Sequence, residues 1–235
     1  MLRRVMMAGG GGSGATDPYW ANVVSLLHFD GADGGTTFVD DTGRVWTPMG
    51  NAQVDTAQSK FGGASGLFDG SGDAIATPNV AALNFGTGDF TIELWMRTTT
   101  TSGVALVAGK HEASTGSWIL LRNGASLQLY VSSTGSSWNM VNGIAIGTIA
   151  ANTWAHIAVV RDGTTFRTFL NGVAGVTSTS SASVFAGAQR VVVGGNIGGA
   201  GGDWFSGHID ELRITKGVAR YTSNFTPPSA PFPDS

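Results

Sequence analysis

Two turn signals that lie close together constrain the fold of this chain more than any other feature. Between Trp154 and Val176, two short segments rich in β-branched and aromatic residues meet at Asp162-Gly163, and a third follows Asn171-Gly172. Asp-Gly and Asn-Gly suit two-residue hairpin turns, because both central residues can take positive φ and the turn then matches the twist of its strands. The segment therefore predicts three consecutive antiparallel strands and an all-β domain around them.

Strand signals recur at short intervals through the rest of the chain. The clearest is Phe90 to Thr98, where side chains alternate with a period of two. The other expected strands are Asn22 to Phe29, Thr37 to Val39, Val45 to Thr47, Ser65 to Phe68, Val104 to Lys110, Trp118 to Arg122, Ser126 to Ser132, Arg190 to Gly194 and Gly207 to Thr215. Only Asn79 to Leu83 and Val218 to Tyr221 suit helical turns. No alternation of strands with helices is visible, which argues against a parallel sheet.

Composition narrows the function classes. The 235 residues include 42% hydrophobic but only 12% charged residues, with a net charge of −3, so no basic footprint for nucleic acid is present. The chain has no cysteine, which excludes disulfides and thiolate metal sites. No apolar stretch approaches the length of a membrane span, and Val5 to Ala8 is too short for a signal-peptide core. We expect one domain without nucleic-acid or membrane partners.

The two ends of the chain differ in composition from the middle. Ala8 to Thr16 is Gly-rich, so residues 1–18 are expected to form a flexible N-terminal arm, with folded structure from Tyr19. The basic and apolar residues at its start are either an anchor that orders on a partner or a frayed terminus. Phe225 to Ser235 contains four prolines and no strand pattern. Residues 226–235 are therefore expected to be an extended surface tail, which leaves 19–225 as the domain.

Several short motifs, in order, resemble those of the concanavalin A-like lectin/glucanase superfamily, in its laminin G-like and pentraxin-like branch. The motifs that carry the resemblance are Leu26 to Gly31, Phe61-Gly62, Leu67 to Gly70, Phe90 to Trp95, Trp154 to Ala158, Leu170 to Gly172 and Phe205 to Ile214. The resemblance covers about Asn22 to Phe225. It implies a jelly-roll β-sandwich of two curved antiparallel sheets, with the first and last strands adjacent.

The same resemblance implies a metal site. Many members of the family hold a structural calcium ion between the first and last strands, and the matching positions here are Asp30 and Asp210, with backbone carbonyls near Gly31. Calcium accepts such a mixture of carboxylate and carbonyl oxygens. The alternative is that both aspartates are simply solvated strand ends. A second acidic loop, with Asp69 and Asp73, is read as a plain Asx-turn in preference to a cation site.

The pattern of carboxylates argues against glycan cleavage. A glycoside hydrolase needs two carboxyl groups across the scissile bond, and the hydrolase branch of the superfamily places them on one strand. The chain has three glutamates, Glu93, Glu112 and Glu211, and none lies in such a pattern. Asp210 and Glu211 are adjacent on an expected strand, so their side chains would point to opposite faces. The four histidines are interpreted as framework residues, and no nucleophile elbow is present, so we expect no enzyme activity.

Aromatic residues beside loop-forming residues suggest a ligand-binding face. Trp138 with Asn139, and Trp204 with Asp203, could stack a ring on a sugar while the polar neighbour bonds its hydroxyl groups. Trp118 and Tyr130 could line the same face. The alternative is that these rings pack under loops. Trp95 and Trp154, in contrast, are assigned to the framework.

Two function classes remain. The favoured one is a virion accessory protein, a capsid decoration, head-fibre or tail-associated module at the virion surface after assembly in the host cytoplasm. Asp17 to Val24 together with Leu27 to Asp33 resembles phage-encoded laminin G-like proteins in particular. Its expected partners are other virion proteins, bound through the N-terminal arm, a host surface glycan, and further copies of itself through sheet edges. The other class is a free bacterial carbohydrate-binding or adhesion module.

Overall fold

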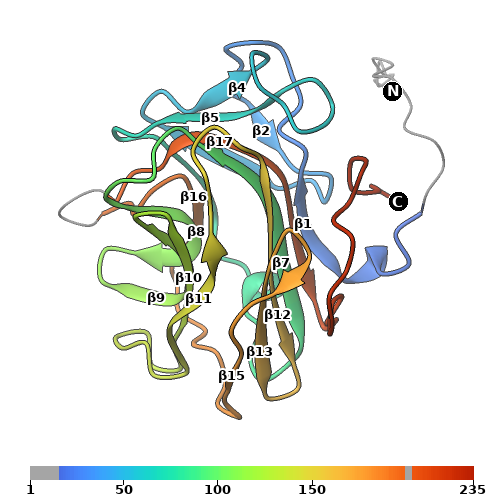
Figure 1. The fold of residues 1–235 in the computed structure, drawn as a ribbon, viewed down its shortest axis with the longest axis vertical. Helices are drawn as coiled ribbons and strands as arrows, with labels where there is room; N and C mark the ends of the chain where they lie inside the picture. The colour runs from blue at the N-terminus through green and yellow to red at the C-terminus, as the bar shows by residue number, and fades with distance from the viewer. Residues whose placement is uncertain (1–15, 199–202) are drawn as a thin grey trace, which may run out of the picture.

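The fold is a sandwich of two antiparallel sheets. The computed structural model describes residues 16–198 and 203–235, and every strand pairing in it is antiparallel (Figure 1). The nine-stranded sheet contains β1 (Val23–Leu27), β4 (Gln53–Asp55), β5 (Ser65–Asp69), β7 (Phe90–Thr98), β12 (Ala155–Asp162), β13 (Thr165–Leu170), β14 (Val173–Ala174), β15 (Ser178–Thr179) and β17 (Ser206–Lys216). The eight-stranded sheet contains β2 (Phe38–Val39), β3 (Val45–Met49), β6 (Ala74–Thr77), β8 (Val104–Glu112), β9 (Thr115–Asn123), β10 (Ser126–Val131), β11 (Val141–Thr148) and β16 (Val191–Val193). The all-β class and the two-sheet sandwich are confirmed.

Within residues 16–198 and 203–235, helical structure is confined to two short 3-10 turns, η1 (Trp20–Asn22) and η2 (Ala81–Leu83). The second lies within the expected helical segment, whereas residues 218–221 form no helix. In the part of the chain that the structure describes, no helix is long and apolar enough to cross a membrane.

The first and last strands are neighbours, as the family resemblance implies. The long strand β17 pairs with β7 and β5, and β1 joins it so that Leu27 faces Leu212. Between Asp210 and Arg213 the register against β7 shifts, and Glu211 takes a positive φ of 54°. A bulge of this kind bends the strand and turns its side chains. It therefore sets the directions of Asp210 and Glu211 beside the end of β1.

The predicted meander forms, with one difference in turn type. Asn171 and Gly172 have φ of 50° and 76°, as a type I′ turn requires. The first turn is shifted by one residue, because Asp162 pairs with Thr165 and leaves Gly163 and Thr164 as the central residues. Only Gly163 has positive φ, at 60°. Glycine at the first central position fits a type II′ turn, so a turn centred on Asp162-Gly163 is the wrong prediction here.

The core lies between the inner faces of the two sheets. Alternate residues of β7 and β10 point into it, such as Ile92 and Leu94 on one sheet and Leu127 and Leu129 on the other. Phe85 stacks on Phe90 with ring centroids 4.2 Å apart, and both rings belong to this core.

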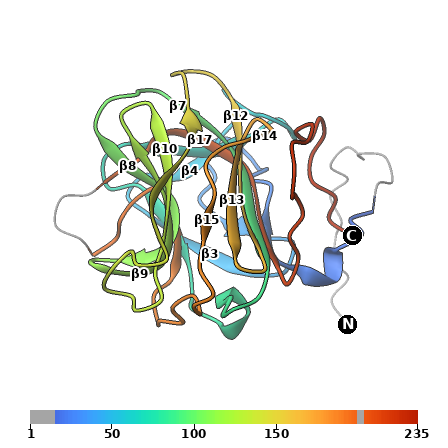
Figure 2. The ribbon, with the colours of Figure 1, turned by 60° about the horizontal axis from the view of Figure 1, so that its bottom comes forward.

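The outer face of the nine-stranded sheet is covered by both ends of the described chain. The Asp17 backbone N–H donates to the carbonyl of Ser235, and the Asp17 carboxylate accepts from Arg213 and Arg220 at 3.0 and 2.7 Å. Phe232 is 3% exposed and its ring covers the Arg213 guanidinium. The ends meet at one flank of the sandwich (Figure 2). The folded unit therefore extends past both expected limits, 19 and 225, and the extended Pro-rich segment is part of its packing.

Candidate functional site

A row of aromatic rings crosses the outer face of the eight-stranded sheet. In β10 the residues Leu127, Leu129 and Val131 enter the core, so Tyr130 points to the opposite face. The ring of Trp138, in the loop after β10, lies 5.7 Å from that of Tyr130 and 5.8 Å from that of His111 at the end of β8. Both Trp138 and Tyr130 are half-buried. We call Tyr130, Trp138 and His111 the aromatic patch.

His111 connects the aromatic patch to the loop that follows β16. Its Nδ1 atom lies 3.1 Å from the Asn196 amide oxygen, and the Asn196 amide nitrogen donates to the Ala113 carbonyl at 3.3 Å. Burial lowers the pKa of His111, and the hydrogen bond to Asn196 and the charge of Asp203 only partly offset this effect. The side chain is therefore neutral near pH 7. The sequence reasoning missed both His111 and Asn196 as site residues.

The second predicted loop is used for packing. The Trp204 ring covers a small apolar cluster of β6 and β16 that includes Ala76 and Val192. It approaches Gly195 so closely that any Cβ atom there would clash with it. Asp203 is half-buried, and its backbone carbonyl accepts from Leu106 at 2.8 Å. Trp204 thus packs against this cluster on the outer face and beside Gly195, so its ring has a packing role.

Two other predicted residues have structural roles. Trp118 is 1% exposed and lies in the core between the sheets, so the expectation that it lines a ligand-binding face is wrong. In the alternation of β9 its position faces inward, opposite the neighbouring Ile119. The Asn139 amide accepts from the Ser133 backbone and donates to the Ser133 hydroxyl, at 3.0 and 2.8 Å. Asn139 therefore holds the loop that positions Trp138.

The predicted metal ligands Asp30 and Asp210 are brought to one loop. Asp210 Oδ2 accepts from the backbone N–H groups of Lys60 and Phe61, at 2.7 and 3.1 Å. The next residue, Gly62, lies against the Asp30 carboxylate, where any Cβ atom would clash with it. Asp210 is fully buried, and its other oxygen, Oδ1, has no hydrogen-bond partner. Such an oxygen is costly to bury unless a donor or a cation satisfies it.

Electrostatics at this loop also favour a cation. Burial raises the pKa of Asp210 to about 7, and the negative charges of Glu211 and Asp30 contribute to the rise. Burial likewise raises the pKa of Asp30. Among the described residues no three His, Asp or Glu side chains form a metal cluster. The donors beside the two carboxylates would therefore be backbone carbonyls such as that of Gly31, a mixture that suits calcium.

The second acidic loop is internally satisfied. Asp73 Oδ2 accepts from the backbone N–H of Asp69 at 2.8 Å, and Asp69 Oδ1 accepts from that of Ser71 at 2.7 Å. These contacts are those of an Asx-turn, as the sequence indicated.

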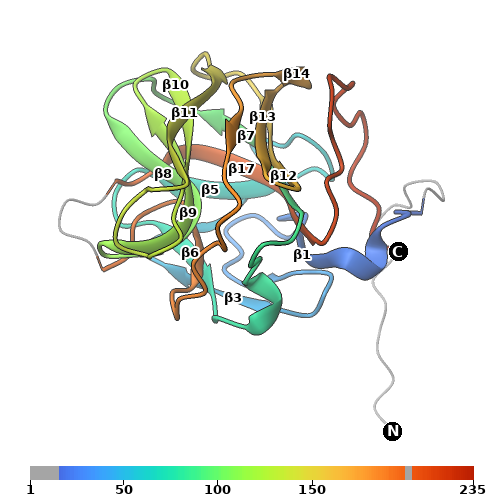
Figure 3. The same cartoon turned by 90° about the horizontal axis from the view of Figure 1, so that it is seen from below.

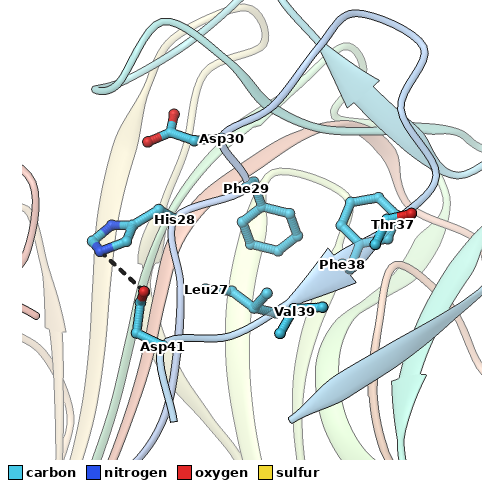
Figure 4. Close-up of a pocket in the computed structure, with 8 residues that line it drawn as sticks. All are labelled: Leu27, His28, Phe29, Asp30, Thr37, Phe38, Val39 and Asp41. Carbon is cyan, nitrogen blue, oxygen red and sulfur yellow. Dashed lines mark ion pairs between the residues drawn. The ribbon is translucent and has the colours of Figure 1, made fainter. Parts of the chain in front are cut away.

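A cavity of about 270 Å³ opens beside Asp30 (Figure 4). Its lining comes from the end of β1 and from β2 with its flanking residues: Leu27, His28, Phe29, Asp30, Thr37, Phe38, Val39 and Asp41. The His28 ring lies between Asp41 and Glu211, at 3.3 and 2.8 Å. Burial alone would lower the pKa of His28, but the hydrogen bond and charge of Glu211, with the charge of Asp41, raise it to about 9. His28 is therefore a charged framework residue that joins β1 to β17.

Comparison with known protein families assigns the chain to a superfamily. A laminin G family model, described as the concanavalin A-like lectin/glucanases superfamily, matches residues 69–220. This span is more than half of the 235 residues. The chain belongs to this superfamily.

Solved structures share the fold of this concanavalin A-like domain at low sequence identity. The binding domain of Paraclostridial Mosquitocidal Protein 1 has a TM-score of 0.65 at 12% identity, over 85% of this chain and 50% of that one. The receptor binding domain of botulinum neurotoxin D has a TM-score of 0.62 at 13% identity, over 86% of this chain and 51% of that one. The chain thus spans about half the length of these toxin domains. No curated protein matches it significantly.

A third structure matches over nearly its whole length. Domain 4 of AbnA, a GH43 extracellular arabinanase from Geobacillus stearothermophilus in complex with arabinotriose, has a TM-score of 0.61 at 20% identity. The match covers 84% of this chain and 94% of that one. These likenesses show that the chain has the fold of lectin-like binding domains.

All three glutamates of this concanavalin A-like domain are engaged by other side chains. Glu93 is paired with Arg213 at 2.8 Å and is fully buried. Glu112 is paired with Arg190 at 2.6 Å, and Glu211 accepts from His28 and from the Phe232 backbone, each at 2.8 Å. None of these carboxylates belongs to the aromatic patch.

Proposed function

We propose that this protein is a non-enzymatic carbohydrate-binding module displayed on a virion, and that the aromatic patch is its sugar-binding site. The observation that supports the site is the position of Trp138, half-buried between His111 and Tyr130. Aromatic rings present large apolar faces at a small entropic cost, and a ring held in place by its neighbours loses little freedom on binding.

Relatives of the same fold add support. AbnA domain 4 was solved with arabinotriose, and a botulinum neurotoxin D binding domain was solved with N-acetylneuraminic acid, at 11% identity to this chain. At such identities the two structures support the use of the fold for saccharides. They leave the sugar of this chain open.

The engaged glutamates support a binding role without catalysis. Hydrolysis needs an acid and a nucleophile or base on either side of the bond. Glu93 is held as an anion by Arg213, which lowers its pKa to about 2 against the effect of burial. Such a carboxylate is neither a proton donor at neutral pH nor accessible to a sugar.

The virion role is supported by where the chain ends leave the sandwich. The described ends meet at the bond between Asp17 and Ser235, while the loop of Trp138 follows β10 on the opposite flank (Figure 3). If residues 1–15 attach to a capsid or tail protein, the aromatic patch faces away from the particle. Detection of the protein in purified particles tests this role, and its absence from them contradicts it.

A free bacterial carbohydrate-binding module is the second candidate. The observation that favours it is the match to 94% of AbnA domain 4, a module of an extracellular arabinanase. Neighbouring capsid, portal or tail genes would support the virion role, whereas secretion or glycan-utilisation genes would support the free module. Self-association through sheet edges stays a prediction for both.

A structural calcium ion at Asp30 and Asp210 is part of the proposal. The unpartnered Asp210 oxygen and the raised pKa values of both carboxylates support it. The ion would stabilise the junction of β1 and β17, remote in sequence from Trp138.

Substitution of Trp138 tests the sugar site. We expect Trp138→Ala to lower the affinity for glycan-array hits by about 10-fold or more, because a stacking surface is removed. Trp138→Phe should retain part of the affinity. The control is Trp154→Ala, at another half-buried tryptophan, which should leave binding unchanged. Melting temperatures are recorded for every variant. An array without hits, or full binding by a folded Trp138→Ala variant, contradicts the proposed site.

A further inference from the structure

We propose that the aromatic patch selects neutral saccharides and rejects saccharides that carry a carboxylate, such as sialic or uronic acids. This inference rests on the proposed function and specifies the ligand class of the same site. Proteins recognise a sugar carboxylate chiefly through an available guanidinium or ammonium group, which offsets the cost of removing the anion from water. The charges around the patch therefore decide between the two classes.

The elements that carry the patch have few charged residues. These elements are β8 to β11, the loop 132–140, the segment 187–198 and residues 203–205. Their Asp, Glu, Lys and Arg side chains are Lys110, Glu112, Arg122, Arg190 and Asp203. Residues 199–202 are glycine and alanine in sequence. An acidic sugar would thus need Lys110, Arg122 or Arg190.

Lys110 and Arg122 face the interior. Lys110 is in register with Trp118 and Val191, both members of the core, and is 1% exposed. Its ammonium group donates to the Gly187 carbonyl. Arg122 is buried too and donates to three backbone carbonyls, those of Ser102, Gly103 and Gly124. Neither cation is available on the outer face of the sheet.

Arg190 is already occupied by a carboxylate. Its Nη2 and Nε atoms lie 2.6 and 2.7 Å from Glu112 Oε1, and its backbone N–H donates to Glu112 Oε2 at 3.2 Å. Three contacts to one carboxylate hold the guanidinium in place and cancel its charge. Arg190 therefore offers a sugar carboxylate a guanidinium whose charge Glu112 already offsets.

The two charges that act on His111 are both negative. The charges of Asp203 and Glu112 both act on His111, and burial keeps the pKa of His111 below its usual value, so the ring adds no positive charge near pH 7. On these elements of the described chain an acidic sugar would meet like charge and no exposed cation without a carboxylate partner, and both effects lower its affinity.

The polar groups around the rings are suited to hydroxyl groups. Tyr130 donates to the Gln128 amide oxygen at 3.0 Å, which leaves amide donors and hydroxyl lone pairs at the rim. Asn196 provides a second amide beside His111. Uncharged groups that both donate and accept match neutral sugars without a charge to compensate.

Matched saccharide pairs test the inference. Each neutral oligosaccharide that binds on an array is compared by calorimetry with its sialylated or uronic-acid counterpart, in parallel with Trp138→Ala. We expect the acidic member to bind about 10-fold more weakly or worse, because like-charge contact is unfavourable. Affinity for the neutral member should change little between about 50 and 500 mM NaCl.

The outcomes separate the two proposals. Binding that depends on Trp138 but is equal or tighter for acidic members overturns the neutral-sugar inference and retains the sugar site. Absence of any saccharide binding that depends on Trp138 overturns both.

Release of Arg190 provides a test by gain of function. Glu112→Gln removes the carboxylate that occupies Arg190 and one of the negative charges near His111. We expect affinity for the acidic member to rise about 5-fold or more, with affinity for the neutral member unchanged. The control is Asp162→Asn, which releases Arg167 from a pair at 3.2 Å on the other sheet. An unchanged ratio of acidic to neutral binding in a folded Glu112→Gln variant overturns the role assigned to the Glu112 and Arg190 pair.

Discussion

Glu93 is a fully buried carboxylate whose neighbours keep it ionised. Arg213 donates to it through two nitrogens, at 3.0 and 2.8 Å, and the Tyr221 hydroxyl donates at 2.8 Å. Burial alone would raise its pKa, but the charge of Arg213, together with His156 and Arg220, outweighs this effect and lowers the pKa from 4.5 to about 2. The sequence placed Glu93 on an alternating strand but gave no sign of its partners, because they come from β17 and the C-terminal segment.

This lowered pKa predicts how stability depends on acid. Since the folded pKa lies below the unfolded value, the contribution of Glu93 is fully present above pH 4.5 and is lost as the pH falls towards 2. Glu93→Gln should lower the free energy of unfolding at pH 7 by about 3 kcal/mol, because a buried guanidinium loses its partner. Urea unfolding measures both effects.

The Glu93 prediction has a matched control. Asp162→Asn breaks the partly exposed pair with Arg167 and should cost less than about 1 kcal/mol. Equal losses in the two variants would contradict the central role of Glu93 in the buried network.

The pKa of Asp210 is shifted in the opposite direction to that of Glu93, and its effect on stability tests the calcium proposal. Its folded pKa of about 7 lies above the usual 3.8, so its contribution is present at low pH and is lost as the pH rises through 7. With chelator, the free energy of unfolding should fall by about 2 kcal/mol between about pH 4.5 and 6.5, below the range in which His28 loses its proton. Calcium should reverse this loss by favouring the ionised form.

Asp210→Asn should remove the response to calcium and reduce the pH dependence to the part that comes from Asp30. Asp69→Asn, in the internally satisfied acidic loop, is the control and should keep both. A melting temperature at pH 7.5 that is the same with calcium and with chelator would contradict the metal site.

Strands whose own sequence alternates between the two faces were predicted well. Phe90 to Thr98 is the strand β7 with the expected limits, because one of its faces enters the core and the other carries polar residues. The strands β4, β6, β11 and β15 were missed. In β6, Ala74 to Thr77 is buried on both faces, since Trp204 covers the outer one, so no alternation is visible. β11 is a sheet edge that contains two glycines. A strand whose burial depends on a distant loop cannot be recognised from local periodicity.

The C-terminal segment is the element whose packing the sequence understated. The segment contains four prolines and forms no strand. The burial of Phe232 against Val23 and Leu26 depends on the sheet face that β1 presents. Its backbone N–H also donates to Glu211 at 2.8 Å, which no local pattern shows.

Truncation of Phe232 tests the importance of this packing. Phe232→Ala should lower the free energy of unfolding by about 3 kcal/mol, because it removes a buried ring and its contact with Arg213, whose guanidinium lies 3.9 Å from the ring centroid. Pro231→Ala, at the exposed neighbour, should stay within about 0.5 kcal/mol of the parent protein. Urea unfolding distinguishes them, and a Phe232→Ala variant as stable as Pro231→Ala would show that the segment contributes little.

At the scale of the whole molecule, the candidate site combines residues that are distant in sequence. Trp138 and Tyr130 could be proposed from the sequence because they lie beside loop-forming and alternating residues. His111 and Asn196 could not, because His111 approaches the rings only when β8, β9 and β10 pair, and Asn196 joins them only when β16 pairs with β8. Trp118 was misassigned because an aromatic in a short strand can face either way until the register is known. The sequence therefore offered Trp138 and Tyr130 as candidates but gave no indication of the charges around them.

The start of the folded unit also depends on the whole molecule, because Asp17 bonds to β17 and to the C-terminus. A chain that starts at Thr16 keeps the pairs of Asp17 with Arg213 and Arg220, at 3.0 and 2.7 Å, and a chain that starts at Tyr19 loses them. We expect the shorter chain to be less stable by about 3 kcal/mol in urea, since two buried guanidiniums lose a partner. Asp17→Asn in the longer chain should reproduce most of the loss. Equal stability of the two truncated chains would place the start of the fold at Tyr19. If the expected difference is found, the chain that starts at Thr16 is the proper variant for testing whether residues 1–15 attach the protein to a particle.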